Sequence, residues 1–247
     1  MNSGMDEKRF LELARRAARS GRPGYSHFID PALTGAARRC AAAEGARVEF
    51  SGGYDGAERV VAAFLPADEE PDFPITCLEL TWNTRFADAG HRDLLGAVMG
   101  LSIERDATGD IVMAGDGRAY LFAERDMAGY IMANLESAGR ASLKIAEHAG
   151  AVEPPEPRGV RQRITLASSR LDAFVSSGYN LSRSEAQKLI QSGLVKKDHV
   201  PEMRADARVD EGSLISVRGH GRMKVEKLLG ETKKGRLAAQ VFRYGGK

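Results

Sequence analysis

The chain has 247 residues, of which 43% are hydrophobic and 28% are charged, values that are ordinary for a globular protein. This length favours roughly two or three small domains over a single one. The N-terminus alternates charged and apolar residues, unlike a signal peptide, and no apolar run approaches the roughly 18 residues of a membrane span. We therefore expect a cytoplasmic protein with no membrane span, in which Cys40 and Cys77 are reduced thiols.

Charge is distributed unevenly along the chain, although the net charge is only +2. Residues 161–247 hold 18 Lys and Arg against 9 Asp and Glu, a balance of +9, whereas residues 1–160 hold 18 against 25, a balance of −7. A basic C-terminal part on an acidic body is typical of a protein that binds a polyanion. The alternatives are a solvated basic face without a ligand and, for the acidic N-terminal half, a protein partner.

Residues 1–70 are expected to form an N-terminal α/β domain. Apolar residues recur at helical spacing over 5–20, and a second helix is predicted over 32–44. Strands are predicted over 47–50 and 60–65. The segment Phe28-Ile29-Asp30-Pro31 is interpreted as a turn, because a proline holds the preceding residue in an extended conformation.

Residues 71–151 are expected to form a middle domain in which strands and helices alternate. The predicted elements are, in order, a strand over 75–82, a helix over 91–101, strands over 110–114 and 119–123, a helix over 126–138 and a closing strand within 141–147. This is the order of the ferredoxin-like fold, which RNA-recognition domains share with many enzymes. The order alone therefore predicts a fold and no function.

Two aromatic residues of this middle domain, Tyr120 and Phe122, share one face of a predicted strand. RNA-recognition domains stack bases on aromatic residues at such positions, so Tyr120 and Phe122, with Arg92, are candidates for a second RNA surface. The alternative is that both side chains are buried in the core, which would give the same alternation along the strand. His91 and Asp93 lie two apart on a predicted helix and face different ways, which argues against a catalytic pair. Asp93 or Asp88 is instead expected to cap that helix.

Residues 158–247, which follow the proline-rich linker 152–157, are expected to form a basic third domain. Ser182 is predicted to cap a helix over 183–192, with Glu185 completing a capping box. On this helix the apolar residues group on one side and the polar and basic residues on the other. A short helix that exposes cations near its positive N-terminus suits phosphate oxygens.

More basic residues follow the helix, and two glycines among them allow the backbone to approach a phosphate closely. His220 lacks a second His or Cys at metal-ligand spacing, so no metal site is expected. The candidates for contact with a polyanion such as RNA are Ser182, Arg183, Ser184, Gln187, Lys188, Lys196, Lys197, Arg218, Gly219, His220, Gly221, Arg222 and Lys224, and a resemblance to a known domain implies Arg170 as well.

Several motifs resemble known families. The stretch 170–217 resembles the S4 RNA-binding domain, through Arg170-Leu171-Asp172, the 182–186 segment and the 189–195 segment. Upstream, five motifs in order resemble the YlmH-like family of bacterial S4 proteins. They are Phe28-Ile29-Asp30-Pro31, the glycine-rich segment 52–59, the helix 91–101, Arg105 and Gly109-Asp110-Ile111.

The resemblance implies an α+β protein with an N-terminal α/β piece, a ferredoxin-like middle domain and a C-terminal S4 (αL) domain. It further implies a non-enzymatic protein that binds ribosomal RNA of the large subunit, with tRNA as a further candidate, in translation or ribosome-associated quality control. One departure is Lys196-Lys197-Asp198-His199, where S4 domains usually carry a Val-Asn-Gly-like turn.

Two other function classes are compatible with parts of the sequence. An RNA-modifying enzyme is the first, because S4 domains are also appended to pseudouridine synthases and methyltransferases. A methyltransferase needs a Gly-rich loop after the first strand of a Rossmann-like domain, and residues 1–150 offer none. The segment 52–56 also lacks the Lys-Ser/Thr ending of a P-loop. The second class is a cell-division scaffold, which stays open. No cofactor is expected.

Overall fold

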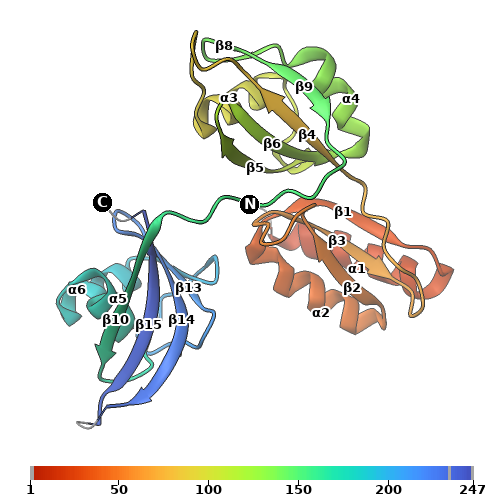
Figure 1. Ribbon diagram of the computed structural model, residues 1–247. Coiled ribbons are helices and arrows are strands. Elements are labelled where there is room, and N and C mark those ends of the chain that lie inside the picture. The colour runs from red at the N-terminus through yellow and green to blue at the C-terminus, as the bar shows by residue number, and fades with distance from the viewer. Residues whose placement is uncertain (1–2, 233–234, 246–247) are drawn as a thin grey trace. The chain divides into compact units, whose positions relative to one another are not determined.

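The computed structural model describes residues 3–232 and 235–245 (Figure 1). The chain divides into two compact units, one that ends at Pro155 and one that begins at Glu156. No helix among the described residues is long and apolar enough to cross a membrane. Helices and sheets occur in both units, so the fold is α+β as expected.

The first unit begins with a small α/β layer, called here the N-terminal layer. Its elements are α1 (Ser3–Ser20), β1 (Gly24–Ile29), the 3₁₀ helix η1 (Pro31–Leu33), α2 (Thr34–Glu44), β2 (Arg47–Ser51) and β3 (Val60–Leu65). The antiparallel sheet has the order β1-β3-β2. Phe10, Ala14 and Ala17 of α1 recur at helical spacing and are buried in one core with Phe64 of β3.

The segment Phe28-Ile29 is not part of a turn, contrary to the sequence-based expectation. Both residues close strand β1 and pair with Val61 and Val60 of β3. The proline does hold Asp30 extended, at φ −69° and ψ 144°, but an extended residue also continues a strand. The chain turns only at η1, which begins at Pro31, the last residue of the predicted turn.

The middle layer of the same unit follows. Its elements are β4 (Ile75–Thr81), α3 (His91–Gly100), η2 (Arg105–Ala107), β5 (Thr108–Gly115), β6 (Arg118–Glu124), α4 (Arg125–Asn134), β7 (Ser137–Ala138), β8 (Ala141–Ser142) and β9 (Lys144–Glu147). The antiparallel sheet has the order β5-β6-β4-β9, which is the predicted ferredoxin-like topology. Helices α3 and α4 bury Leu94, Val98 and Ile131 in one core with Leu78 and Leu121 of the sheet.

The second helix of this layer is shorter than predicted. It ends at Asn134, because Leu135 leaves the helical conformation at φ −89° and ψ 93°. Ser137–Ala138 then pairs with Ala141–Ser142 in a short hairpin. Gly139, at φ 58°, provides the left-handed residue that this turn requires.

The other face of the middle sheet is covered by the N-terminal layer. Phe122 is only 1% exposed and shares a core with Phe28 and Val61. Tyr54 stacks on the Phe122 ring at a centroid distance of 4.8 Å. A Cβ on Gly53 would lie 2.5 Å from the same ring, so a glycine is needed for this close approach.

This packing corrects the predicted second RNA surface. Phe122 is buried and cannot stack on a base. Tyr120 is half-buried and its ring lies 4.8 Å from that of His148. Arg92 is exposed on α3, a helix that packs on the opposite face of the sheet. The three residues therefore do not form one surface, and the two aromatics serve the contact between layers.

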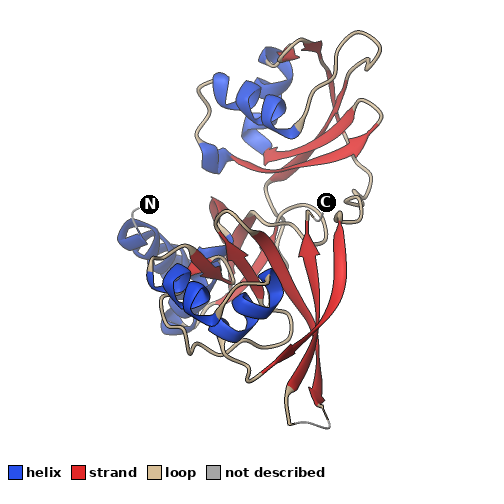
Figure 2. Cartoon of the chain, turned by 90° about the vertical axis from the view of Figure 1, so that its left-hand side faces the viewer, coloured by secondary structure: helices blue, strands red, loops and turns tan. Residues whose placement is uncertain are grey.

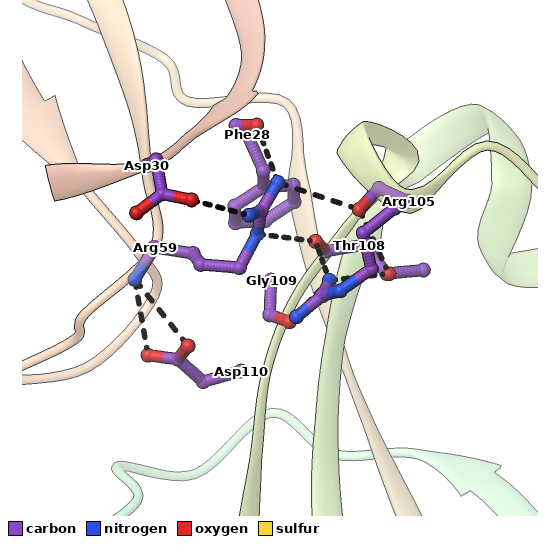
Figure 3. Close-up of polar contacts among 7 residues, drawn as sticks. All are labelled: Phe28, Asp30, Arg59, Arg105, Thr108, Gly109 and Asp110. Atoms are coloured by element: carbon purple, nitrogen blue, oxygen red, sulfur yellow. Dashed lines mark hydrogen bonds and ion pairs between the residues drawn. The ribbon is translucent and has the colours of Figure 1, made fainter. Parts of the chain in front are cut away.

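Arg59 forms the polar part of this contact (Figure 3). Its Nη2 donates to the Phe28 carbonyl at 2.8 Å, and its Nε donates across the junction to the Thr108 carbonyl at 3.2 Å. On the other side, Arg105 donates to the carbonyls of Thr108 and Gly109 at 2.7 and 3.1 Å. Burial and the neighbouring Arg59 lower the pKa of Arg105 from its ordinary value.

Asp110 completes the junction from strand β5. Its Oδ2 accepts from the Tyr54 hydroxyl at 2.9 Å and from the Glu58 N–H at 2.7 Å, and its carboxylate also receives the Arg59 N–H. Burial, with the Asp110 charge, raises the pKa of the Tyr54 phenol and keeps it a donor. The motifs around Phe28, Arg59, Arg105 and Asp110 therefore join the two layers.

Replacing Asp110 with alanine should lower the free energy of unfolding of the first unit by about 1–3 kcal/mol, because three donors lose their shared acceptor. Urea unfolding followed by circular dichroism measures this change. Glu136→Ala, at an exposed position, is the control and should leave the midpoint unchanged. Equal midpoints for both variants would show that Asp110 does not hold the layers together.

The second unit is a six-stranded antiparallel sheet with two helices on one face (Figure 2). Its elements are β10 (Gly159–Leu166), α5 (Leu171–Tyr179), α6 (Arg183–Gln191), β11 (Val195–Lys197), β12 (Val200–Pro201), β13 (Leu214–Val217), β14 (Gly221–Glu231) and β15 (Leu237–Tyr244). The sheet order is β10-β15-β14-β13-β11-β12. Phe174 of α5 and Ile190 of α6 are fully buried in one core with Val225 and Val241 of the sheet.

Candidate nucleic-acid interface

The second unit contains a buried carboxylate, that of Asp172 in the first turn of α5. Its side chain is 0% exposed. Arg170 reaches both carboxylate oxygens through Nε and Nη2, each at 3.2 Å, and Arg183 reaches both at 3.2 and 3.3 Å. Gln187 adds a hydrogen bond from its amide at 3.0 Å. We call these four residues the Asp172 cluster.

The charge of Asp172 is stable inside the protein only because of these donors. Burial by itself raises the pKa of the Asp172 carboxyl, but the hydrogen bonds from Arg170, Gln187 and Arg183 outweigh it and hold the pKa at about 2. Asp172 is therefore ionised at every pH near neutrality, and it fixes two guanidinium groups in place.

Both arginines still face solvent. The side chains of Arg170 and Arg183 are 41% and 48% exposed, although each gives two N–H groups to Asp172. A guanidinium carries five N–H donors, so three on each remain for an external acceptor. Planar donors of this kind match the oxygens of a phosphate. The cluster thus presents two pre-oriented cations from one buried anion.

The start of α6 is built as the sequence predicted. Ser182 Oγ accepts from the Glu185 N–H at 3.2 Å, and Glu185 Oε2 accepts from the Ser182 N–H at 2.8 Å, which confirms the capping box. Ser182 is thereby committed to bonds within the protein. Gln187 is committed as well, through its hydrogen bond to Asp172. Ser184 and Lys188 are exposed on the same helix and can reach a ligand.

A cleft of about 580 Å³ lies beyond the other end of α6, between the turn into β11 and the turn from β13 to β14. We call it the basic pocket. Among the predicted residues, Lys196, Arg218, Gly219, Gly221 and Arg222 line it. Gly193, Leu194, His199, Ser216 and Val217 also line it, and they were not predicted.

The register of the sheet explains why distant residues meet at the basic pocket. Lys196 pairs with Ser216, and Ser216 pairs with Arg222, so the three side chains form a row across β11, β13 and β14. The Arg218 N–H donates to the Leu194 carbonyl at 2.9 Å and closes the pocket against the end of α6. Gly219, at φ 84°, forms the turn at its rim.

Tyr179 at the end of α5 supports this turn and was missed by the sequence analysis. Its hydroxyl is within hydrogen-bond distance of two carbonyl oxygens, that of Gly221 at 3.1 Å and that of Ile215 at 3.3 Å, and both can accept its proton. Burial raises the pKa of Tyr179 to about 12, so the hydroxyl keeps its proton. The His220 ring packs edge-on against Tyr179 at 5.9 Å. The sequence does not indicate this role, because a tyrosine at the end of an apolar helix has no pattern that points to a distant turn.

The remaining predicted residues lie outside the pocket. Lys197 pairs with Ile215, a buried position, and forms an ion pair with Asp198 at 3.2 Å, so it does not share the surface of Lys196. Lys224 is exposed on β14, two residues after Arg222 and on the same face of the strand. It extends the basic surface beyond the pocket.

The Asp172 cluster and the basic pocket lie at the two ends of α6. The cluster presents two fixed cations, and the pocket presents exposed cations beside glycines. This chemistry suits several phosphates of a folded polyanion. Among the residues that the structure describes, no group of three His, Cys, Asp or Glu is placed to hold a metal ion.

Comparisons with known proteins agree with this geometry. Residues 169–215 match the S4 domain, and residues 68–151 match a family model described as "Putative RNA-binding domain in YlmH". The fold and the site thus define an S4-domain protein.

One curated relative shows the family, and one solved structure shows the same fold. The chain is 34% identical over 245 residues to the Bacillus subtilis (strain 168) protein named "Ribosome-associated protein quality control protein P2", covering 93% of this chain and 92% of that protein. The solved structure titled "Cell division protein ylmH from Streptococcus pneumoniae" has the same fold over 60% of this chain and 92% of that chain, with a TM-score of 0.50 and 24% identity. The chain belongs to the YlmH family of S4-domain proteins.

Acid should destabilise the second unit through Asp172. A folded-state pKa of about 2, below the ordinary value, gives stability that is complete above about pH 4 and is lost as the pH falls towards 2. The shift corresponds to about 2 kcal/mol of unfolding free energy. Asp172→Asn should remove this part of the pH dependence and unfold more easily at pH 7, as measured by urea titrations at several pH values.

Glu231→Gln is the control, because Glu231 is exposed at the end of β14 in the same unit and its variant should unfold like the wild type. An Asp172→Asn protein with wild-type stability and an unchanged acid profile would refute the structural role of the cluster.

Proposed function

We propose that this chain is a non-enzymatic RNA-binding protein that docks its second unit on ribosomal RNA of the large subunit. The observation that carries the proposal is the buried Asp172, which holds Arg170 and Arg183 half-exposed. The basic pocket lies at the other end of α6, and the Asp172 cluster belongs to the part of the chain that matches the S4 domain. Fixed cations bind a folded RNA better than mobile ones, because less side-chain entropy is lost on binding. Phosphate contacts of this kind position a protein on RNA without reading its sequence.

The Bacillus subtilis relative is named as a ribosome-associated protein of protein quality control, and we propose the same role for this chain. The proposed place of action is the cytoplasm, with tRNA as a second RNA that the same basic surface could touch. We further propose three domains, over residues 1–70, 71–151 and 158–247. At the two sites, Gln187 and Tyr179 are committed to structural hydrogen bonds and the cations are exposed, which favours binding over catalysis.

The structure changes which residues should be tested. Arg183 is a poor choice for charge reversal, because a glutamate beside the buried Asp172 would destabilise the fold. Lys196 and Arg218 are both exposed at the basic pocket. Substitutions of these two residues should therefore change RNA binding without changing the stability of the fold.

Lys196→Glu combined with Arg218→Glu should weaken binding to the large ribosomal subunit by at least about tenfold at near-physiological salt. The slope of log affinity against log salt should also fall by about 1.5, since each phosphate contact contributes about 0.7–0.9. Sedimentation with purified subunits over a range of KCl concentrations measures both quantities.

The control is Arg163→Glu with Lys227→Glu, which makes the same change of charge on the same unit. Both residues are exposed and oppose Gln240 in one row across β10, β15 and β14, away from the pocket. Equal weakening by the two pairs would mean that net charge acts without a site. Undiminished binding of the pocket variant would place the RNA contact elsewhere.

A further inference from the structure

Phe86 is the most exposed large hydrophobic side chain among the described residues, at 88%. It lies in the loop between β4, which ends at Thr81, and α3, which begins at His91. The loop falls within residues 68–151, the part that matches the RNA-binding family model. At this exposure almost the whole ring is available to stack on a ligand.

The loop that carries Phe86 is ordered by its own hydrogen bonds. The buried Trp82 donates from Nε1 to Asp88 Oδ1 at 3.1 Å, and its N–H donates to the Gly117 carbonyl at 2.8 Å. The N–H groups of Arg85 and Phe86 donate to Asn83, at 3.0 and 3.1 Å. The ring is therefore presented on a built scaffold, and little order has to be gained when it binds.

Cations accompany the ring. Arg85 precedes Phe86 directly, and Arg92 is exposed in the first turn of α3, which the loop leads into. The two carboxylates of this segment are occupied locally. Asp88 accepts from Trp82, and Asp93 accepts from the Gly90 N–H at 2.9 Å, which confirms the predicted cap of α3.

The usual stacking surface of an RNA-recognition fold is closed in this protein. The sheet face that would stack bases is covered by the N-terminal layer, with Phe122 buried beneath Tyr54. The part of the chain before residue 161 is also acidic, with a balance of −7, so phosphate attraction alone is weak there. A contact in this layer has to gain its affinity from stacking.

We propose that Phe86 stacks on an unpaired base of RNA while Arg85 and Arg92 hold the flanking phosphates. The proposal rests on the proposed RNA-binding function, because the second unit brings the RNA. It adds a single-stranded segment as the ligand of the middle layer. An aromatic ring flanked by arginines is the combination that binds single strands without sequence preference.

The test uses the full chain and a fluorescein-labelled 20-nucleotide oligouridine in anisotropy titrations. Phe86→Ala should weaken binding by about five- to 100-fold, whereas Phe86→Tyr, which keeps a ring, should bind like the wild type. Tyr130→Ala is the control, since it removes a partly exposed ring from α4 of the same layer and should have no effect. Thermal unfolding checks that all variants fold.

The outcomes separate this inference from the function on which it rests. If Phe86→Ala binds oligouridine like the wild type while the Lys196 and Arg218 variant loses the large subunit, the stacking site is wrong and the RNA-binding function stands. If the wild type binds neither RNA, both fail. A photo-crosslinker at position 86 should label oligouridine, and its labelling of a protein partner but not of the RNA would also overturn the proposal.

Discussion

The buried carboxylate of Asp172 constrains the rest of the proposed interface. An unpaired charge at 0% exposure would be too costly, so Arg170, Arg183 and Gln187 must converge on it. Their convergence fixes α6 against α5, and the end of α6 then leads through the turn at Gly193 into strand β11 and the basic pocket. The same bonds that neutralise Asp172 leave both guanidinium groups facing solvent. One buried anion therefore supports the fold and prepares the cations for phosphate.

In the first unit, the main constraint is the contact between the two α/β layers. Arg59 and Asp110 satisfy backbone groups from both layers, and the Tyr54 and Phe122 rings stack beside them. Four of the five motifs that resemble the YlmH-like family therefore act in this junction, whereas the fifth, the helix 91–101, packs on the other face of the middle sheet. Covering the sheet of the middle layer removes its usual RNA surface. The most exposed ring of this layer is instead Phe86, on the loop between β4 and α3.

Local patterns predicted much of this architecture. Periodic apolar residues predicted the helices, and the serine–glutamate spacing predicted the cap at Ser182, because both depend on neighbours in sequence. Strand β10 and its pairing with β15 were not predicted, since that pairing joins the two ends of the unit. The burial of Phe122 was equally hidden, because strand alternation does not show whether another layer covers a face. Lys196 and Arg222 were predicted separately, but only the strand register places them in one row.

The central claim is that the second unit holds RNA phosphates at the Asp172 cluster and the basic pocket. Ultraviolet crosslinking of the full chain to purified large ribosomal subunits, followed by mass spectrometry of the RNA-bound peptides, tests it most directly. We predict crosslinked peptides that contain Lys188, Lys196 and the segment 218–222. Crosslinks confined to the first unit, with none on the second, would contradict the account.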